Sequence, residues 1–207
     1  MEKPRLLITG GSGFVGSRLA RDLAGAWDVT GTCFSREPQA GQVRLDLGDE
    51  RQAARVFAEA RPQAVLHTAA IGDPDLCEKD PAAAFRVNRD AAASLARLAR
   101  EAGARFIHFS TDLVFDGRGS FYKETDAPNP LSVYGRSKLE SEAAVLGRHP
   151  QAAVLRVATV YGRALSGRPS FTDTLRERLG RGEKVKVMTD QWRTATACAQ
   201  IPQVVAA

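Results

Sequence analysis

A glycine-rich loop near the N-terminus constrains the fold of this chain more than any other stretch. Residues 9–16 read TGGSGFVG, after the apolar run RLLI and before the amphipathic run SRLARDLAG. In such a strand–loop–helix unit, Gly10 allows a tight turn, Gly13 lets the backbone approach a pyrophosphate, and Gly16 lets the helix pack close to the sheet. The N–H groups at the start of the helix then receive the phosphates. The alternative is a glycine-rich turn that holds no ligand.

Apolar and amphipathic runs alternate along the rest of the chain and predict strands and helices in turn. The apolar runs predict strands over 5–10, 27–34, 42–47, 63–70, 105–111 and 152–162. The amphipathic runs predict helices over 12–25, 49–62, 81–104, 131–148 and 170–185, and 184–192 is predicted as a strand or a loop. The strands are continuously apolar, as when helices cover both sheet faces. We therefore predict an α/β, Rossmann-type, doubly wound parallel sheet over residues 1–163.

Composition and charge narrow the class of protein. Apolar residues make up 43% of the chain and charged residues 26%, which is typical of a soluble domain. The net charge is +5, but the arginines are spread over helix faces among acids, so we expect no nucleic-acid partner. No apolar run is long enough for a membrane span. The start of the chain has no apolar leader, and three scattered cysteines match neither a disulfide framework nor a metal site, which predicts a cytoplasmic protein without a metal.

The end of the second predicted strand carries information about the cofactor. In proteins that bind NAD, an acid at this place bonds the ribose 2′-hydroxyl. Here Ser35 and Arg36 stand there, and both can bind a 2′-phosphate. We therefore expect NADP(H) as the preferred cofactor, with NAD(H) as the second choice. The alternative for Arg36 is a solvated loop arginine, and the neighbouring Glu37 favours that alternative.

Two segments downstream carry the residues for chemistry. FSTDLVFDG places Ser110, Thr111 and Asp112 at the carboxyl end of the fifth strand, where open α/β sheets bind ligands. YGRSK places Tyr134 and Lys138 four residues apart, on one face of a helix.

The spacing of these residues predicts proton transfer to a carbonyl group. A phenol has a pKa of about 10, and a neighbouring ammonium lowers it. We expect Lys138 to lower the pKa of Tyr134 and to bond the nicotinamide ribose. Tyr134 would then protonate a carbonyl oxygen as hydride arrives, while Thr111 polarises that oxygen.

The motifs TGGSGFVG, STDLVFDG, YGRSKLESE, LRVATVYG and DQW, in this order, resemble the extended branch of the short-chain dehydrogenase/reductases. The order is similar to that of the dTDP-4-dehydrorhamnose reductase family, from about residue 3 to residue 192. The resemblance implies NAD(P)H-dependent reduction of a nucleotide-linked 4-keto-6-deoxysugar, in the last step of dTDP-L-rhamnose synthesis. It implies a nucleotide-sugar substrate as partner. The sequence does not determine the oligomeric state, for which a homodimer is one candidate.

The same resemblance implies roles for individual residues. The expected catalytic residues are Thr111, Tyr134 and Lys138, and the expected substrate-binding residues are Thr111, Asp112 and Thr159. Asp46 would meet the adenine amino group, Leu47 would pack on the adenine ring, and Asn88 matches a helix asparagine of the family. The alternative for Asn88 is an ordinary helix-surface residue. The expected cofactor-binding residues are Gly10, Ser12, Gly13, Phe14, Val15, Gly16, Ser35, Arg36, Asp46, Leu47, Ala69, Ala70, Ile71, Asn88, Ser110, Tyr134 and Lys138.

The chain departs from the resembled pattern in its last part. Thr159 stands where rhamnose-forming reductases often carry a tryptophan, and a threonine lacks that stacking surface. After DQWRT the chain continues ATACAQIPQVVAA instead of the usual PT and acidic helix start. Residues 164–207 are therefore predicted as the remnant of a small substrate-binding domain. AAIGDPDLCEKDP also resembles the regulatory β subunit of methionine adenosyltransferase, which leaves a catalytically silent NADP-binding subunit as the second interpretation.

Overall fold

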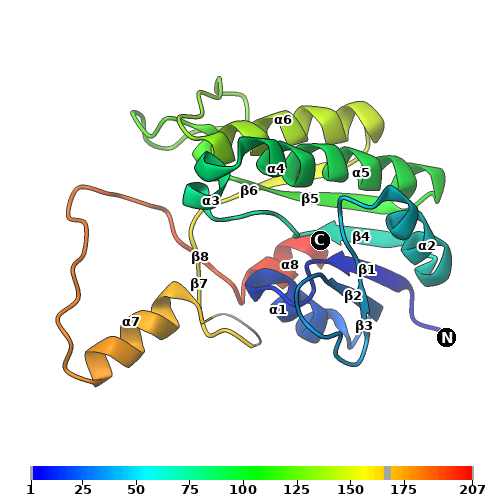
Figure 1. Cartoon of the computed structure of the whole chain (residues 1–207), viewed down its shortest axis with the longest axis horizontal. Helices are drawn as coiled ribbons and strands as arrows, with labels where there is room; N and C mark the ends of the chain where they lie inside the picture. Colours follow the sequence, from blue (N-terminus) through cyan, green and yellow to red (C-terminus); the bar gives the residue numbers. More distant parts are fainter. Residues whose placement is uncertain (1, 166–168, 207) are drawn as a thin grey trace.

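A single parallel sheet organises the molecule (Figure 1). The computed structural model describes residues 2–165 and 169–206. The six strands lie in the order β3-β2-β1-β4-β5-β6, and every neighbouring pair is parallel. This is the order of a doubly wound dinucleotide-binding sheet, so the predicted fold class is confirmed. The strands are β1 (Arg5–Thr9), β2 (Asp28–Cys33), β3 (Gln42–Arg44), β4 (Ala64–His67), β5 (Arg105–Thr111) and β6 (Ala153–Val157).

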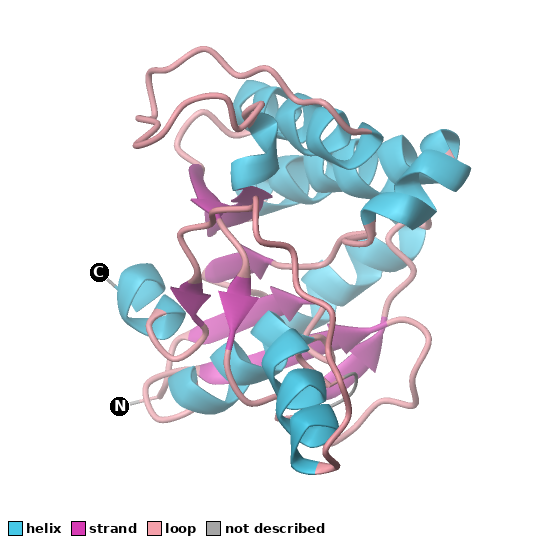
Figure 2. Cartoon of the chain, turned by 90° about the vertical axis from the view of Figure 1, so that its left-hand side faces the viewer, coloured by secondary structure: helices cyan, strands magenta, loops and turns pink. Residues whose placement is uncertain are grey.

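Helices cover both faces of the sheet, which explains the continuous apolar runs (Figure 1 and Figure 2). On one face α2 (Glu50–Ala60), α5 (Ala91–Glu101) and α6 (Val133–Arg148) pack over side chains such as Leu7 and Phe106. On the other face α1 (Phe14–Leu23) and α8 (Ile201–Ala206) pack over the alternate side chains, Leu6 and Ile8 among them. Successive strand residues point to opposite faces, so each strand needs apolar side chains at every position.

The segment before α5 is more divided than the single helix predicted over 81–104. It consists of α4 (Pro81–Phe85), a π-helical turn (Arg86–Asp90) and α5. An unpredicted helix, α3 (Pro74–Lys79), precedes them. Asp73 and Asp80 each cap the start of a helix with the side chain, and a proline follows each of them in the first turn. Two successive Asp-Pro caps therefore start two short helices.

Two predicted strands are shorter than expected. β3 ends at Arg44 rather than at residue 47, because the backbone turns at Asp46, whose carboxylate accepts the N–H of Gly48 at 2.8 Å. The strand predicted over 152–162 ends at Val157. The next two residues of strand, β7 (Val160–Tyr161), pair with β8 (Thr196–Ala197) in a separate two-stranded sheet. The chain thus leaves the main sheet before the end of the apolar run.

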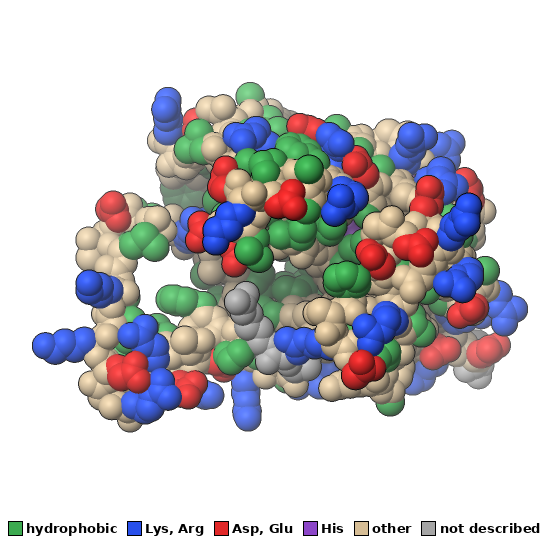
Figure 3. Space-filling model, viewed as in Figure 1, with side chains coloured by type: hydrophobic (Ala, Val, Ile, Leu, Met, Phe, Trp, Pro, Cys, Tyr) green, Lys and Arg blue, Asp and Glu red, His purple; other side chains and the backbone are tan. Residues whose placement is uncertain are grey.

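Residues 169–195, which we call the C-terminal arm, extend away from the sheet (Figure 1). Figure 3 shows an opening between the arm and the rest of the molecule. The arm contains α7 (Phe171–Gly180), which has no buried residue, and a loop in place of the strand considered over 184–192. Trp192 in this loop is 93% exposed, whereas the second tryptophan, Trp27, packs against the core beside α1.

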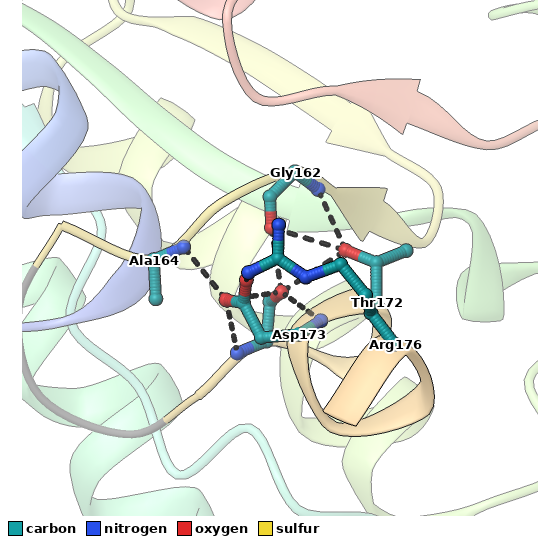
Figure 4. Close-up of polar contacts among 6 residues, drawn as sticks. Gly162, Ala164, Thr172, Asp173 and Arg176 are labelled. Atoms are coloured by element: carbon teal, nitrogen blue, oxygen red, sulfur yellow. Dashed lines mark hydrogen bonds and ion pairs between the residues drawn. The ribbon is translucent and has the colours of Figure 1, made fainter. Parts of the chain in front are cut away.

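A cluster of polar contacts fixes the start of α7 (Figure 4). Ser170 caps the helix and accepts the N–H of Asp173 at 3.0 Å, and the Asp173 carboxylate accepts the N–H of Ser170 at 3.1 Å. The same carboxylate accepts the N–H of Ala164 at 2.8 Å, and these hydrogen bonds lower the pKa of Asp173. Ser170 and Thr172 also donate to the carbonyl of Gly162. The cluster joins the arm to the segment that follows β7.

No helix within the described ranges is both long and apolar enough to cross a bilayer.

Candidate functional site

The glycine loop at the carboxyl end of β1 has a backbone that requires glycine. Gly10 has φ +73°, and a Cβ there would lie 3.0 Å from the backbone of Ala69, at the end of β4. A Cβ at Gly16 would overlap the carbonyl oxygen of Gly10. Side chains at these two positions would therefore push the loop away from β4 or the helix away from the loop. The positive φ of Gly10 fits the predicted tight turn, whereas the close approach at Gly16 is to the loop and not to the sheet.

The start of α1 fits an anionic group. Gly13 is the cap residue, has no side chain to fill the N-terminal end, and is exposed. The first amides of an α-helix have no carbonyl partner within the helix, and the first turn of α1 contains no acid. Phe14, Val15 and Gly16 supply those amides. The loop is therefore suited to bind the phosphates of a dinucleotide. Both the helix dipole and the free N–H groups favour a negative charge at this end of α1.

The loop after β2 leaves the predicted 2′-phosphate residues accessible. Ser35 and Arg36 are exposed, and neither has a hydrogen bond or ion pair with another described residue. Glu37 forms an ion pair with Arg44 at 3.0 Å, so the neighbouring acid has a partner other than Arg36. Farther on, Asp46 is exposed and Leu47 packs partly against the core under α2.

The residues after β4 are held by a buried asparagine. Asn88 is fully buried in the π-helical turn, so the alternative of a helix-surface asparagine is wrong. It accepts the N–H of Ile71 at 2.8 Å and donates to the carbonyl of Ile71 at 3.2 Å. It also donates to the hydroxyl of Ser137 on α6 at 3.0 Å. Asn88 therefore fixes the segment of Ala69, Ala70 and Ile71 relative to α6.

Thr111 and Tyr134 lie together at the carboxyl edge of the sheet. Thr111 ends β5 and is buried, and its hydroxyl hydrogen bonds with the Tyr134 phenol at the start of α6. Burial raises the pKa of Tyr134 to about 12, with Cys77 and Asp112 adding to the rise and the hydrogen bond to Thr111 opposing it. The predicted lowering of this pKa by Lys138 is wrong for this structure. Tyr134 is a neutral phenol, able to donate a proton.

Lys138 lies one turn along α6 and only 2% of it is exposed. Burial lowers the pKa of Lys138 to about 7, and the Glu142 carboxylate opposes that fall. Its Nζ lies 3.3 Å from Nε2 of His108 on β5. Nζ of Lys138 is thus directed to a histidine, and Lys138 is not among the groups that shift the pKa of Tyr134.

Three further predicted residues have partners within the protein. Ser110 donates to Glu142, whose carboxylate forms an ion pair with Arg156 at 2.7 Å. Asp112 forms an ion pair with Arg193 of the C-terminal arm at 3.4 Å. Thr159 is exposed, and its carbonyl accepts the N–H of Thr196 at 2.9 Å. The Asp112–Arg193 pair brings the arm to the edge of the sheet that carries Thr111.

The sequence interpretation did not single out His67, His108 or Arg193. His67 and His108 are paired in register in the two neighbouring strands β4 and β5, and both are buried. A histidine in each of two apolar strands, just before their carboxyl ends, was a usable signal. Arg193 gave none, because its position depends on how the arm folds. The described parts of the chain contain no cluster of three His, Cys, Asp or Glu side chains that could hold a metal.

Comparisons with known proteins agree with this arrangement. The RmlD substrate binding domain family model matches residues 4–207. The chain is 39% identical, over 86% of its length, to methionine adenosyltransferase 2 subunit beta of Danio rerio, and covers 54% of that protein. It is 35% identical, over 94% of its length, to the probable low-salt glycan biosynthesis reductase Agl14 of Haloferax volcanii, and covers 67% of that protein. It thus spans about half of the first relative and two thirds of the second.

The similarity to known proteins includes the three-dimensional structure. The dTDP-4-dehydrorhamnose reductase from Bacillus anthracis, determined in complex with NADP, superposes with a TM-score of 0.87 at 29% identity. The superposition covers 100% of this chain and 70% of that chain. The predicted resemblance is confirmed: the chain belongs to the RmlD substrate-binding-domain family, within the extended short-chain dehydrogenase/reductases.

Proposed function

We propose that this chain is the cofactor-binding part of an NADPH-dependent reductase that acts on a nucleotide-linked 4-keto-6-deoxysugar. The observation that carries the proposal is the pair Thr111–Tyr134, hydrogen bonded at the carboxyl edge of the sheet. Tyr134 shares a helix with the buried Lys138, and the glycine loop opens at the same sheet edge. The likeness to reductases of this family supports it.

Three residues of this chain would have separate roles in the reduction of the carbonyl group. NADPH, when bound, supplies the hydride. Tyr134 holds a proton on its neutral phenol and donates it to the carbonyl oxygen of the substrate. Thr111 donates a hydrogen bond to the same oxygen and polarises the carbonyl group. Lys138, one turn farther along α6, would bind the nicotinamide ribose.

Further residues would bind the cofactor and the substrate. The first amides of α1 would hold the pyrophosphate, and Arg36, free of other partners in the described chain, would bind the 2′-phosphate and favour NADPH over NADH. Asp112 and Thr159 would face the sugar. We further propose that residues 164–207 include the remnant of a small substrate-binding domain, since Arg193 of this segment contacts Asp112.

A two-step experiment tests the proposal. Nicotinamide fluorescence first measures binding of NADPH and NADH, and tighter binding of NADPH is expected. Absorbance at the NADPH band then follows oxidation with a dTDP-linked 4-keto-6-deoxysugar. Tyr134→Phe should reduce the rate by a factor of about 10²–10⁴ and leave NADPH binding in place. Tyr161→Phe, at an exposed tyrosine of β7, is the matched control and should retain full activity. Turnover that survives Tyr134→Phe would contradict the assigned role.

A second candidate function is a regulatory subunit that binds NADP without turnover. Four relatives of this chain, from zebrafish, cattle, orangutan and Xenopus, are methionine adenosyltransferase 2 subunits beta at 33–39% identity. In this chain the segment DPDLCEKDP, which carries the resemblance, forms α3 and the start of α4. A pull-down with a methionine adenosyltransferase catalytic subunit distinguishes the two functions. Stable binding that is insensitive to Tyr134→Phe, with no oxidation of NADPH, would favour the regulatory function.

A further inference from the structure

The side chains of Ser110 and Glu142 join the two elements that carry Thr111 and Tyr134. Ser110 lies on β5, one residue before Thr111, and Glu142 lies on α6, about two turns after Tyr134. The hydroxyl of Ser110 donates a hydrogen bond to the carboxylate of Glu142. The hydrogen bond between Thr111 and the Tyr134 phenol runs between the same strand and the same helix. The geometry of the first contact therefore constrains that of the second.

Ser110 is directed to α6 and not to the opposite face of the sheet. Its neighbour Phe109 packs on that opposite face with Leu6 and Ile8, and successive strand residues alternate between the faces. Only 3% of Ser110 is exposed, and its hydroxyl donates to Glu142. A hydroxyl has one proton, so Ser110 has none left to donate to a cofactor.

Arg156 of β6 fixes the carboxylate of Glu142. Nε of Arg156 lies 3.0 Å from Oε1, and Nη2 lies 2.7 Å from Oε2, which makes a bidentate ion pair. Ser110 donates to the same Oε1, and the side chain of Glu142 is only 8% exposed. Donors from two neighbouring strands thus hold the carboxylate in one orientation. Glu142 is therefore a fixed anchor for the end of β5.

We propose that Ser110 and Glu142 are positioning residues, whose hydrogen bond holds the end of β5 against α6 and so sets the distance between the Thr111 hydroxyl and the Tyr134 phenol. The effect on turnover rests on the proposed function, because it needs Thr111 and Tyr134 to act on one carbonyl oxygen. The effect on the phenol itself does not rest on it. Misplacement of a reacting group by about 1 Å can cost about 10²-fold in rate, so a contact one residue from Thr111 can control the rate without touching the substrate.

Ser110→Ala distinguishes this role from cofactor binding. The variant removes the hydroxyl and leaves the Glu142 carboxylate paired with Arg156, so no buried charge loses its partner. We expect kcat to fall by about 10- to 100-fold, while the Kd of NADPH, measured by nicotinamide fluorescence, stays unchanged. Ser94→Ala removes a serine that donates to Glu50 at 2.9 Å, and this matched control should change neither quantity. Weaker NADPH binding with unchanged kcat would overturn the proposal and favour a cofactor-binding role.

The phenol of Tyr134 gives a second readout, which needs no turnover. The chain has three tyrosines, so labelling with ¹³C at Cζ gives three signals, and Tyr134→Phe assigns one of them. Ser110→Ala should shift the Tyr134 signal, because the phenol moves relative to Thr111, and Ser94→Ala should not. An unmoved Tyr134 signal would overturn the proposal. If the wild type oxidises no NADPH, the proposed function fails, and this signal still decides the role of Ser110.

Glu142→Asp tests the same contact from the helix and covers the case in which Ser110→Ala does not fold. The shorter side chain withdraws the carboxylate from Ser110 and keeps a negative charge for Arg156. It should shift the Tyr134 signal as Ser110→Ala does, and the double variant should shift it no further, because both changes break one hydrogen bond. Glu140→Asp, at an exposed glutamate of α6 that also has an arginine partner, is the control. An equal shift in Glu140→Asp, or additive shifts in the double variant, would overturn the proposal.

Discussion

The sheet and the C-terminal arm are stabilised in different ways. In the sheet, side chains such as Leu7, Ile8 and Val65 are completely buried between helices on both faces. In the arm, α7 buries none of its residues and depends on the polar cluster around Asp173 at its first turn. Full burial of an apolar side chain contributes about 1.5–3 kcal/mol, whereas a capping side chain contributes about 1 kcal/mol. The predicted cofactor-binding residues therefore lie on a tightly packed sheet. The arm that carries Arg193 is attached to it by a few polar contacts.

Helix α8, at the end of the described chain, packs against one face of the sheet. Ile201 of α8 is buried with Leu19 of α1 on the sheet face opposite α6. The boundary between 163 and 164 remains a prediction, and α8, which lies beyond it, packs against the core of the sheet. Among the described residues, the segment between Pro169 and the residues before β8 extends away from the sheet.

The largest effect is expected from a cavity in the sheet. Phe106→Ala removes a fully buried ring of β5 and should lower the free energy of unfolding by about 3–5 kcal/mol. Phe171→Ala removes the same ring from α7, where it is 66% exposed, and should cost less than about 0.5 kcal/mol. Urea unfolding of both variants measures the difference. Similar losses in the two variants would mean that the arm is packed as firmly as the sheet.

A smaller loss is expected in the tail. Ile201→Ala should cost about 2–3 kcal/mol, because the side chain is buried under the sheet. Val204→Ala on the same helix, at a side chain that is 59% exposed, is the control and should cost about 0.5 kcal/mol. The same urea unfolding experiment applies. Equal, small losses would show that α8 does not contribute to the core.

A local loss is expected at the start of α7. Ser170→Ala removes the cap and should destabilise the helix by about 1 kcal/mol. Hydrogen exchange of the amides of α7 should accelerate about fivefold, whereas the amides of β5 should be unaffected. Thr174→Ala, at an exposed position of the same helix, is the control. Faster exchange throughout the sheet would show that the arm and the sheet unfold together.

The smallest effect is a pH dependence confined to the arm. Hydrogen bonds from the amide of Ala164 and from Ser170 hold the pKa of Asp173 below its value in the unfolded chain. This contribution is therefore present above the unfolded pKa, and it is lost as the pH falls through the folded pKa. Acidification below about pH 4 should loosen α7 before the sheet, as seen in its amide NMR signals. Asp173→Asn should remove this dependence; a loss of α7 signals at the same pH in that variant would contradict the assignment.

The sequence was sufficient for the sheet and insufficient for parts of the site. Continuous apolar strands and the glycine loop predicted the sheet because each depends on local residues and on the few topologies that bury both faces. The two Asp-Pro caps that create α3 and α4 were present in the sequence but were read as one helix start at Pro81. The shift in the pKa of Tyr134 depends on burial and on where Nζ of Lys138 points, and spacing along a helix determines neither. The contact between Arg193 and Asp112, 81 residues apart, was likewise beyond pattern analysis.

The two tryptophans divide between the two regions and so act as built-in optical reporters. Trp27 packs against the core beside α1, where its indole is partly shielded from water, while Trp192 stands in solvent on the arm. A shielded indole emits at shorter wavelength than a solvated one, so the emission spectrum of the unlabelled protein contains one signal from each region. Loss of the blue component reports melting of the sheet. A blue shift or quenching of the red component reports that something has covered the arm, with no label attached to either part.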